Sequence, residues 1–305
     1  MTRLNEWAPE ALRRSLANEG IALSLGAARI HIRSDVPALG AALARVYGQF
    51  PTEAPQGFFD VAPRLEQVRR AAYLFRPQLR FFVDGEVPFE LFPADTHLPL
   101  LEWGLNWCLA DRSNHKLLLH AGVVEKNGRA AILPALPGSG KSTLTAALSA
   151  RGFRLLSDEF GVVDTEDGTL SALLRPVALK NESIEVIRQF HPDAVLGPVF
   201  PKTRKGDVAH MAPDRISVDR RNEAAKPHVV LFPMYEAGAP LVLEEVPQAR
   251  CFAKLSTNSF NYEVLGPVGF QAVVRLVRET RSYSLRYSNL DEAIRRVADL
   301  FEDDL

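Results

Sequence analysis

The stretch Ala135-Leu-Pro-Gly-Ser-Gly-Lys-Ser-Thr143 separates two segments of different character. Before it, Arg129-Ala-Ala-Ile-Leu-Pro134 is typical of a buried strand, and after it Ser142–Ala150 is small and apolar enough for a helix. A glycine loop that joins a strand to a helix is the context that a phosphate-binding loop requires. Ala135 stands where the usual Walker A pattern has glycine, a position that mainly makes the turn. The stretch therefore predicts a P-loop that binds a nucleotide.

The residue types of this loop have the chemistry that phosphate binding requires. Gly138 and Gly140 let the backbone curl so that successive N–H groups face an anion. The dipole of the following helix places its positive end at the same point. Lys141 is expected to reach the β- and γ-phosphates, and the Ser142 hydroxyl to bind Mg²⁺. The residues predicted to surround the nucleotide are Pro137, Gly138, Ser139, Gly140, Lys141, Ser142 and Thr143. The predicted cofactors are ATP and Mg²⁺, with GTP left open as the nucleotide.

The composition of the whole chain is that of a globular protein of about two domains. Its 305 residues are 47% hydrophobic and 24% charged, which are ordinary values. A net charge of −1 gives no general attraction to nucleic acid or to an anionic membrane, so neither is an expected partner. Cys108 and Cys251 are too few for a disulfide framework. No apolar run approaches the roughly 20 residues of a membrane-spanning helix. We therefore expect a soluble, cytoplasmic protein, and the sequence leaves a homo-oligomer open.

Residues 1–100 are predicted to form a small α+β domain with an accessory or substrate-recognition role. Apolar and polar residues alternate in its strand candidates, and Asp84-Gly85 is typical of a tight hairpin turn. Ser34 or Asp35 is expected to open the first helix. The predicted strands cover residues 21–26, 28–33, 71–75, 79–83 and 87–91, and the predicted helices cover residues 36–50 and 100–111.

Residues 101–305 are predicted to form the nucleotide-binding domain. Strand candidates dominate its middle and helix candidates its ends, which is less regular than repeated βαβ units and favours a mixed sheet in an α/β fold. Besides the segments around the glycine loop, the predicted strands cover residues 116–125, 152–159, 161–163, 170–174, 229–232 and 241–246, and the predicted helices cover residues 270–279 and 290–301.

Two carboxylates follow the glycine loop at an informative spacing. Asp158 and Glu159 end an apolar strand 17 and 18 residues after Lys141, so one helix can return the chain and place both beside the phosphates. Because neighbouring residues of a strand point to opposite faces, the pair is expected to divide its work unless the strand has already ended. One carboxylate would bind the metal while the other takes a proton from a hydroxyl group. The alternative is a solvated strand end. His120, 21 residues before Lys141, is a further candidate beside the loop.

These residues together resemble a known family. His120-Ala-Gly-Val-Val, the glycine loop and Arg151-Gly-Phe-Arg-Leu-Leu-Ser-Asp-Glu159 resemble the catalytic core of HPr kinase/phosphorylase, and more closely the HPr-kinase-related kinase A group. The resemblance covers roughly residues 115–180 and thins out toward the C-terminus. It implies a fold like that of the phosphoenolpyruvate carboxykinases and transfer of phosphate from ATP to a hydroxyl.

The resemblance also implies roles for three residues of the site. Asp158 matches the general base of the family, with His120 nearby to tune it. Glu159 stands where the family has a second Asp and would bind the metal, although the exchange of these two roles stays open. The first 100 residues and the segment after Ile184 do not match the family, so the phosphate acceptor is predicted only as a hydroxyl of a protein, a peptide or a small molecule.

Several basic residues lie after the acidic pair and could neutralise charge in a transition state. Arg175 and Lys180 follow an apolar segment and are the stronger candidates, while Lys202, Arg204 and Lys205 flank Gly206 in a loop. Each is equally compatible with a solvated basic surface. His210 has no pattern that assigns it a role, and no His or Cys pair has the spacing of a zinc site.

The leading hypothesis from the sequence is an ATP- and Mg²⁺-dependent kinase that acts on a hydroxyl group. Asp158, His120 and Lys141 are its predicted catalytic residues, and Ser142 and Glu159 its predicted metal ligands. The alternative is a nucleotide-gated binding module with slow or absent hydrolysis, in which the nucleotide orders the loop at residues 201–206. A carboxykinase acting on a small acid is a third reading, but the His and Lys spacing that it needs is not visible.

Overall fold

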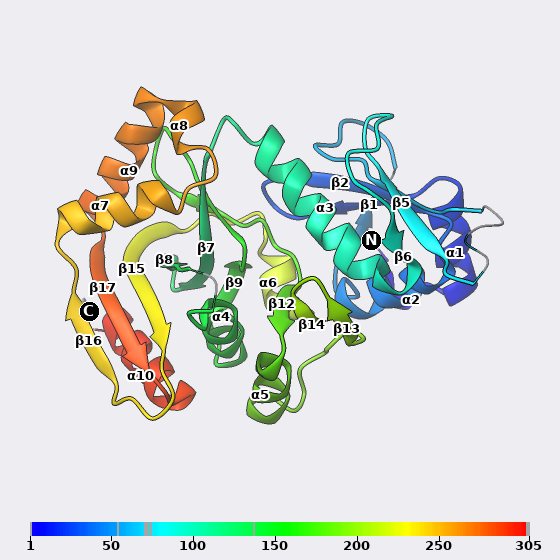
Figure 1. The fold of residues 1–305 in the computed structure, drawn as a ribbon. Helices are drawn as coiled ribbons and strands as arrows, with labels where there is room; N and C mark the ends of the chain where they lie inside the picture. The colour runs from blue at the N-terminus through cyan, green and yellow to red at the C-terminus, as the bar shows by residue number, and fades with distance from the viewer. Residues whose placement is uncertain (1, 54, 70–72, 74, 137, 303–305) are drawn as a thin grey trace.

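The computed structural model describes residues 2–53, 55–69, 73, 75–136 and 138–302. In these residues the protein has a mixed α/β fold, and the strands form a six-stranded, an eight-stranded and a three-stranded sheet. Figure 1 shows the six-stranded sheet in one lobe, the eight-stranded sheet in the other, and the three-stranded sheet between them at one edge.

The first lobe contains the six-stranded sheet in the order β3-β1-β2-β4-β5-β6. Among the described residues of this sheet, β2 and β4 pair in parallel and the other neighbouring strands pair antiparallel. The helices α2 and α3 pack against each other, and α3 packs on β5. The elements are η1 (Leu4–Glu6), α1 (Pro9–Ala17), β1 (Ile21–Ser24), β2 (Arg29–Ser34), α2 (Pro37–Val46), β3 (Thr52–Glu53), β4 (Arg64–Gln67), β5 (Gln78–Phe82), β6 (Phe92–Pro93), η3 (Ala94–Thr96) and α3 (His97–Arg112).

The second lobe contains the eight-stranded sheet, which mixes parallel and antiparallel pairs. Its order is β11-β10-β7-β8-β15-β17-β16, and β9 also pairs with β7. The strands β8, β15 and β17 are mutually parallel, whereas β7 and β16 are antiparallel to their neighbours. Its strands are β7 (Leu117–Lys126), β8 (Arg129–Pro134), β9 (Arg154–Ser157), β10 (Phe160–Val163), β11 (Leu170–Ser171), β15 (Lys226–Tyr235), β16 (Val242–Glu245) and β17 (Arg281–Tyr287).

Helices cover this sheet, and a small sheet extends the lobe toward the first one. The strands β12 (Val177–Lys180), β13 (Phe200–Thr203) and β14 (Gly206–Met211) pair in the order β12-β14-β13. The helix α4 packs on β7, α9 packs on β15 and β17, and α10 packs on β17 and α4. The helices are α4 (Lys141–Ala150), α5 (Glu182–Phe190), α6 (Arg215–Asp219), α7 (Gln248–Thr257), α8 (Tyr262–Leu265), α9 (Pro267–Glu279) and α10 (Leu290–Glu302).

The two lobes share a continuous core of buried apolar side chains. Their backbones also meet directly, because Gly26 forms an isolated bridge with Leu173. A Cβ at Gly26, whose φ is +98°, would come within 2.4 Å of the Ala172 carbonyl oxygen, so only glycine permits this approach. The Arg221 Nε donates to the Ser24 carbonyl at 2.9 Å and strengthens the same contact. The division into domains at about residue 100 stays a prediction, with the two large sheets lying on either side of it.

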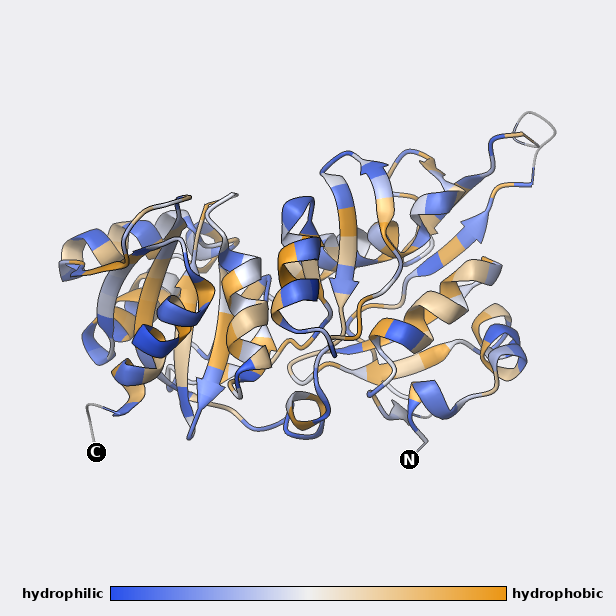
Figure 2. Ribbon diagram, turned by 90° about the horizontal axis from the view of Figure 1, so that it is seen from below, coloured by the Kyte–Doolittle hydropathy of each residue, from blue (hydrophilic) through white to orange (hydrophobic). Residues whose placement is uncertain are grey.

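Figure 2 shows hydrophilic and hydrophobic residues intermixed along the helices. In α9, for example, Ala272, Val273, Leu276 and Val277 are buried, and this helix packs on β15 and β17. No helix in the described part of the chain has the length and apolar character needed to cross a membrane.

The mixed sheet is confirmed, as are the hairpin of β1 and β2, the turn at Asp84-Gly85, and the strand and helix on either side of the glycine loop. The predicted strand over residues 87–91 is wrong, because β5 pairs instead with β6 at residues 92–93. The predicted strand over residues 71–75 falls mostly outside the described residues. Neither Ser34 nor Asp35 is the cap of α2; Val36 holds that position, and the Asp35 carboxylate accepts the Gln67 N–H at 2.8 Å instead.

Candidate active site

The glycine loop turns the chain from β8 into α4 with two residues in the left-handed region. Gly138 has φ +86° and Gly140 has φ +85°, a conformation that other side chains rarely adopt. The helix begins at Lys141, and the Leu144 N–H closes its first turn on the Gly140 carbonyl at 2.9 Å. Ser142 and Thr143 lie half-buried in this first turn, where backbone N–H groups have no partner within the helix. Pro137 lies outside the described residues.

The strand β7 lies between the glycine loop and the acidic pair. On one side, Ala121 pairs with Pro134, the last residue before the loop. On the other side, Val123 pairs with Ser157 and His120 with Phe160, so Asp158 and Glu159 lie opposite the segment between them. The sheet register therefore brings together the loop and the carboxylates that the sequence spacing predicted to be neighbours.

The acidic pair interrupts an otherwise continuous ladder. The strands β9 and β10 both run antiparallel to β7, and the chain leaves the ladder only at Asp158 and Glu159. The Ser157 hydroxyl stabilises this break, because it accepts the N–H of Phe160 at 3.0 Å. The strand has thus ended where the carboxylates begin, and strict alternation of faces no longer applies to them.

Lys141 and Asp158 form a buried contact at the start of α4. The Lys141 Nζ donates to the Asp158 backbone carbonyl and lies 3.7 Å from its carboxylate Oδ1. Both side chains are less than a tenth exposed. The Oδ1 atom itself is buried and accepts no hydrogen bond from the residues that the structure describes. A buried polar atom without a partner costs free energy, so this oxygen is suited to a ligand or a water molecule that supplies one.

Glu159 faces His120 instead. Its Oε1 lies 3.6 Å from His120 Nε2, which is too long for a hydrogen bond. Burial alone would raise the pKa of Glu159, but the surrounding positive charge, that of Lys141 above all, outweighs burial and lowers it below the usual range. Glu159 is therefore a stable anion at neutral pH. Burial, and then the charge of Lys141, lowers the pKa of His120, so this imidazole is neutral at the same pH.

The two basic candidates Arg175 and Lys180 occupy different environments. Arg175 is buried and contacts Glu102 and Asn106 of α3, so its guanidinium is held away from the glycine loop. Its charge nevertheless contributes to lowering the pKa of Glu159. Lys180 is exposed at the end of β12. Its pKa is lowered first by desolvation and then by the charge of Lys205, against the opposing effect of Glu159 and Asp158. Lys180 is thus an exposed cation whose charge interacts with the acidic pair.

The remaining basic residues belong to the hairpin of β13 and β14. Arg204 lies over the ring of Phe92 at 5.2 Å and 3.9 Å from the Glu90 carboxylate, so this hairpin contacts the first lobe. His210 is buried on β14, and its Nδ1 has no hydrogen-bond partner within the described part of the chain. Burial, followed by the charges of Arg175 and Lys180, lowers the pKa of His210 to about 3.

Residues that the sequence analysis did not single out hold the glycine loop in place. Tyr235 donates its backbone N–H to the Ser139 carbonyl at 3.0 Å, and the Tyr287 hydroxyl lies 3.4 Å from the Gly140 carbonyl. Gly122 is a second close approach, because a Cβ there would meet the Thr145 hydroxyl at 2.2 Å. The glycine of the His-Ala-Gly sequence therefore lets β7 and α4 pack tightly.

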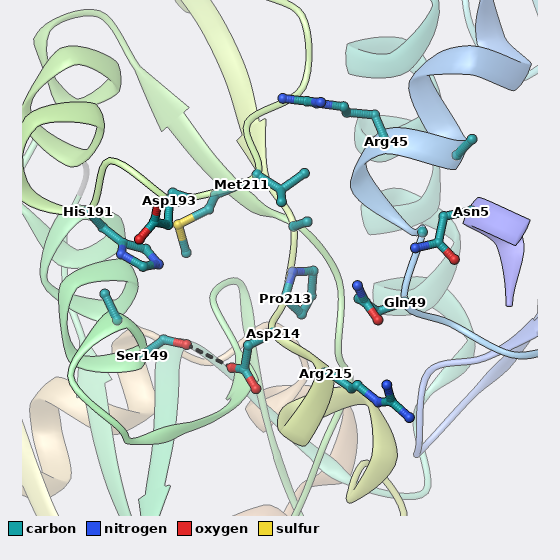
Figure 3. Close-up of a pocket in the computed structure, with 16 residues that line it drawn as sticks. Asn5, Arg45, Gln49, Ser149, His191, Asp193, Met211, Pro213, Asp214 and Arg215 are labelled. Atoms are coloured by element: carbon teal, nitrogen blue, oxygen red, sulfur yellow. Dashed lines mark hydrogen bonds between the residues drawn. The ribbon is translucent and has the colours of Figure 1, made fainter.

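A pocket of about 390 Å³ lies elsewhere, at the carboxyl end of α4. Figure 3 shows Arg45 and Gln49 of the first lobe on one side of it and His191 and Asp214 of the second lobe on the other, with Ser149 bonded to Asp214. A helix of ten residues spans about 15 Å. The pocket is therefore separated from the glycine loop by the length of α4 and does not belong to the predicted nucleotide site.

The described residues fit Mg²⁺ only together with a phosphate ligand. Among them, no three His, Cys, Asp or Glu side chains lie together in a way that could hold a metal ion. Mg²⁺ is commonly held by one or two carboxylates and by oxygens of a bound phosphate. Ser142 and Glu159 supply that kind of donor set.

No protein-family model matches this sequence, and no curated protein matches it either. The resemblance to the HPr kinase/phosphorylase family therefore stays an expectation that rests on the residues quoted above.

Proposed function

We propose that the protein is an ATP- and Mg²⁺-dependent phosphotransferase that moves the γ-phosphate to a hydroxyl group. The observation that carries the proposal is the register across β7, which sets Asp158 and Glu159 beside a glycine loop followed by Lys141. A nucleotide-binding module needs the loop but has no need of two carboxylates next to it. Phosphate transfer needs both the loop and the carboxylates, because catalysis of this reaction depends on positioning and on electrostatic stabilisation.

On the donor side, the loop amides and the start of α4 bind the phosphates, and Lys141 neutralises their charge. Ser142 and Glu159 would hold Mg²⁺, which when bound neutralises charge on the β- and γ-phosphates. The lowered pKa of Glu159 suits this role, because a carboxylate that stays ionised is a good cation ligand and a weak base. Neutral His120 beside it adds no positive charge that would compete with the metal.

On the acceptor side, Asp158 takes the proton of the attacking hydroxyl. Its buried oxygen without a hydrogen bond is the described atom best suited to accept one. A positioned base contributes about 10²- to 10⁴-fold to the rate of such a step. The exposed Lys180 at the end of β12 would add positive charge that stabilises the transferring phosphate. The acceptor itself is proposed only as a hydroxyl of a protein, a peptide or a small molecule.

The test separates binding from turnover. We expect Asp158→Asn to bind Mg-ATP with an affinity near that of the unchanged protein and to lose at least about 100-fold in phosphate release or transfer. Lys141→Ala should lose affinity for ATP itself. Glu166→Gln, which changes an exposed carboxylate in a turn, is the control and should leave both unchanged.

Two results would contradict the proposal. If Asp158→Asn has near-normal turnover, Asp158 is not the general base. If Mg-ATP binds tightly but no phosphate leaves it under any condition, the binding module is the better description.

A further inference from the structure

Tyr235 is the last residue of β15 and lies directly against the glycine loop. Its N–H donates to the Ser139 carbonyl at 3.0 Å. A Cβ built on Gly140 would come within 2.9 Å of the Tyr235 Cβ. The side chain of Tyr235 therefore starts at the loop, and the residue is nonetheless 51% exposed. Half of this aromatic residue is therefore open to solvent beside the loop.

The topology of the sheet determines which part of a nucleotide this ring would meet. The strand β8, which leads into the loop, has β7 on one side and β15 on the other. His120 and the acidic pair lie on the β7 side. If the γ-phosphate faces the acidic pair, the rest of the nucleotide extends along the carboxyl ends of the parallel strands toward β15. Figure 1 shows α4 and the end of β15 next to each other at that edge.

The ring is also held by its neighbours before any ligand arrives. Tyr287 of β17 is buried and pairs with Tyr235 of the parallel neighbouring strand β15. The centroids of the two rings lie 5.9 Å apart in an edge-to-face arrangement. The Glu236 N–H donates to the Tyr287 carbonyl at 3.0 Å and fixes the chain just beyond the ring. A side chain that is ordered in advance loses less freedom on binding, so more of the contact energy appears as affinity.

We propose that the exposed ring of Tyr235 is the base-binding part of the nucleotide site and stacks on the purine. This inference rests on the proposed function, because it requires that the glycine loop holds the phosphates. Stacking uses the face of the ring, which every purine offers, and reads no donor or acceptor pattern. The ligand class is therefore a purine nucleoside triphosphate, with ATP and GTP accepted to a similar degree by this contact.

The test compares ATP with inorganic tripolyphosphate, which has the phosphates without the base. Calorimetric titration in the presence of Mg²⁺ is carried out on the unchanged protein, Tyr235→Ala and Tyr235→Phe. We expect Tyr235→Ala to weaken ATP binding about tenfold and to leave tripolyphosphate binding within about twofold, because the backbone N–H to Ser139 is retained. Tyr235→Phe keeps the ring and should bind ATP like the unchanged protein. Met234→Ala is the matched control, since Met234 is equally exposed and points to the other face of the strand.

The outcomes separate this inference from the proposed function. If Tyr235→Ala binds ATP normally while Lys141→Ala does not, the loop holds the phosphates and the stacking role is wrong. If Tyr235→Ala weakens ATP and tripolyphosphate equally, Tyr235 acts by supporting the loop, and the inference is again overturned. If the unchanged protein binds neither compound, the proposed function fails and the inference fails with it.

Discussion

Replacing Arg175 with methionine should destabilise the protein by an amount that the structure lets us work out. The guanidinium lies 3.4 Å from the Glu102 carboxylate, and both side chains are less than a tenth exposed. The Tyr47 hydroxyl donates to the other oxygen of Glu102 at 2.6 Å. Arg175→Met replaces the guanidinium with a shorter, apolar side chain and leaves Glu102 buried with a single uncharged partner, Tyr47.

Removing one partner of a buried ion pair costs about 3–5 kcal/mol. Two features of this site moderate the loss. Tyr47 retains its hydrogen bond, and Glu102 can take up a proton, because burial already raises its pKa although Arg175 opposes the shift. We therefore expect the free energy of unfolding to fall by about 2–4 kcal/mol at pH 7. With Arg175 gone the pKa of Glu102 rises further, so the folded variant binds the proton more tightly than the unfolded chain does.

The sign of the pH dependence follows from that difference. Stability of Arg175→Met should recover as the pH falls from 7 toward the unfolded pKa of Glu102, and should be lost again as the pH rises. The free energy of unfolding is measured by urea titration at pH 7 and pH 5, with tryptophan fluorescence as the signal. Trp103 and Trp107 lie on α3 together with Glu102 and report directly on this helix.

A second substitution provides the control. In Arg175→Met/Glu102→Gln the uncompensated charge is absent and the amide can still bond to Tyr47. The double variant should therefore regain at least about 1 kcal/mol over Arg175→Met. A loss below about 1 kcal/mol in the single variant, or simple additivity of the two substitutions, would refute this reasoning.

Two further predictions concern the packing of the site and its pH response. Gly122→Ala should lower the Tm by several degrees, at a cost of about 1–3 kcal/mol, because the new methyl group meets the Thr145 hydroxyl. Adding Thr145→Ala to this variant should restore most of the lost stability. If the double variant shows no recovery, the clash is not the cause. The pKa of His210 is about 3 in the folded protein and near 6.5 in the unfolded chain. Between pH 7 and pH 5 the unfolded chain therefore takes up a proton at His210 while the folded protein does not. The protein should lose about 2 kcal/mol of stability through this group over that range. Urea unfolding at the two pH values should show a smaller loss for His210→Gln, and an equal loss in both proteins would rule out His210 as the source.

The parts of the site that were predictable from the sequence are those with local signals. The glycine loop has its residue types in consecutive positions, and apolar periodicity identifies the strand and helix around it. The neighbourhood of Asp158 followed from spacing alone, since one helix returns the chain over a known length. The position of β7 between loop and carboxylates depends on strand pairing between distant segments, which no local pattern encodes.

The parts that were not predictable lacked such signals or had misleading ones. Pro233 suggested the end of a strand, yet β15 continues to Tyr235, because pairing with β8 extends only to Val230 and a proline is tolerated beyond it. Because the predicted strand ended at residue 232, Tyr235 was not predicted to lie next to the loop. No strand was predicted over β17, in which serines and arginines are interspersed among the apolar residues. The strands β12 and β13 are only four residues long and are held by β14, not by their own propensity.

The most direct test of the central claim is to follow the γ-phosphate itself. The protein is incubated with Mg²⁺ and ATP labelled at the γ-position, in the presence of hydroxyl-bearing peptides, proteins and small alcohols, and the products are identified by mass spectrometry. The account predicts a new phosphate ester on a hydroxyl group, formed at least about 100-fold more slowly by Asp158→Asn although that variant still binds Mg-ATP. Label that remains entirely on ATP and free phosphate with every acceptor, or an ester formed equally fast by Asp158→Asn, would contradict it.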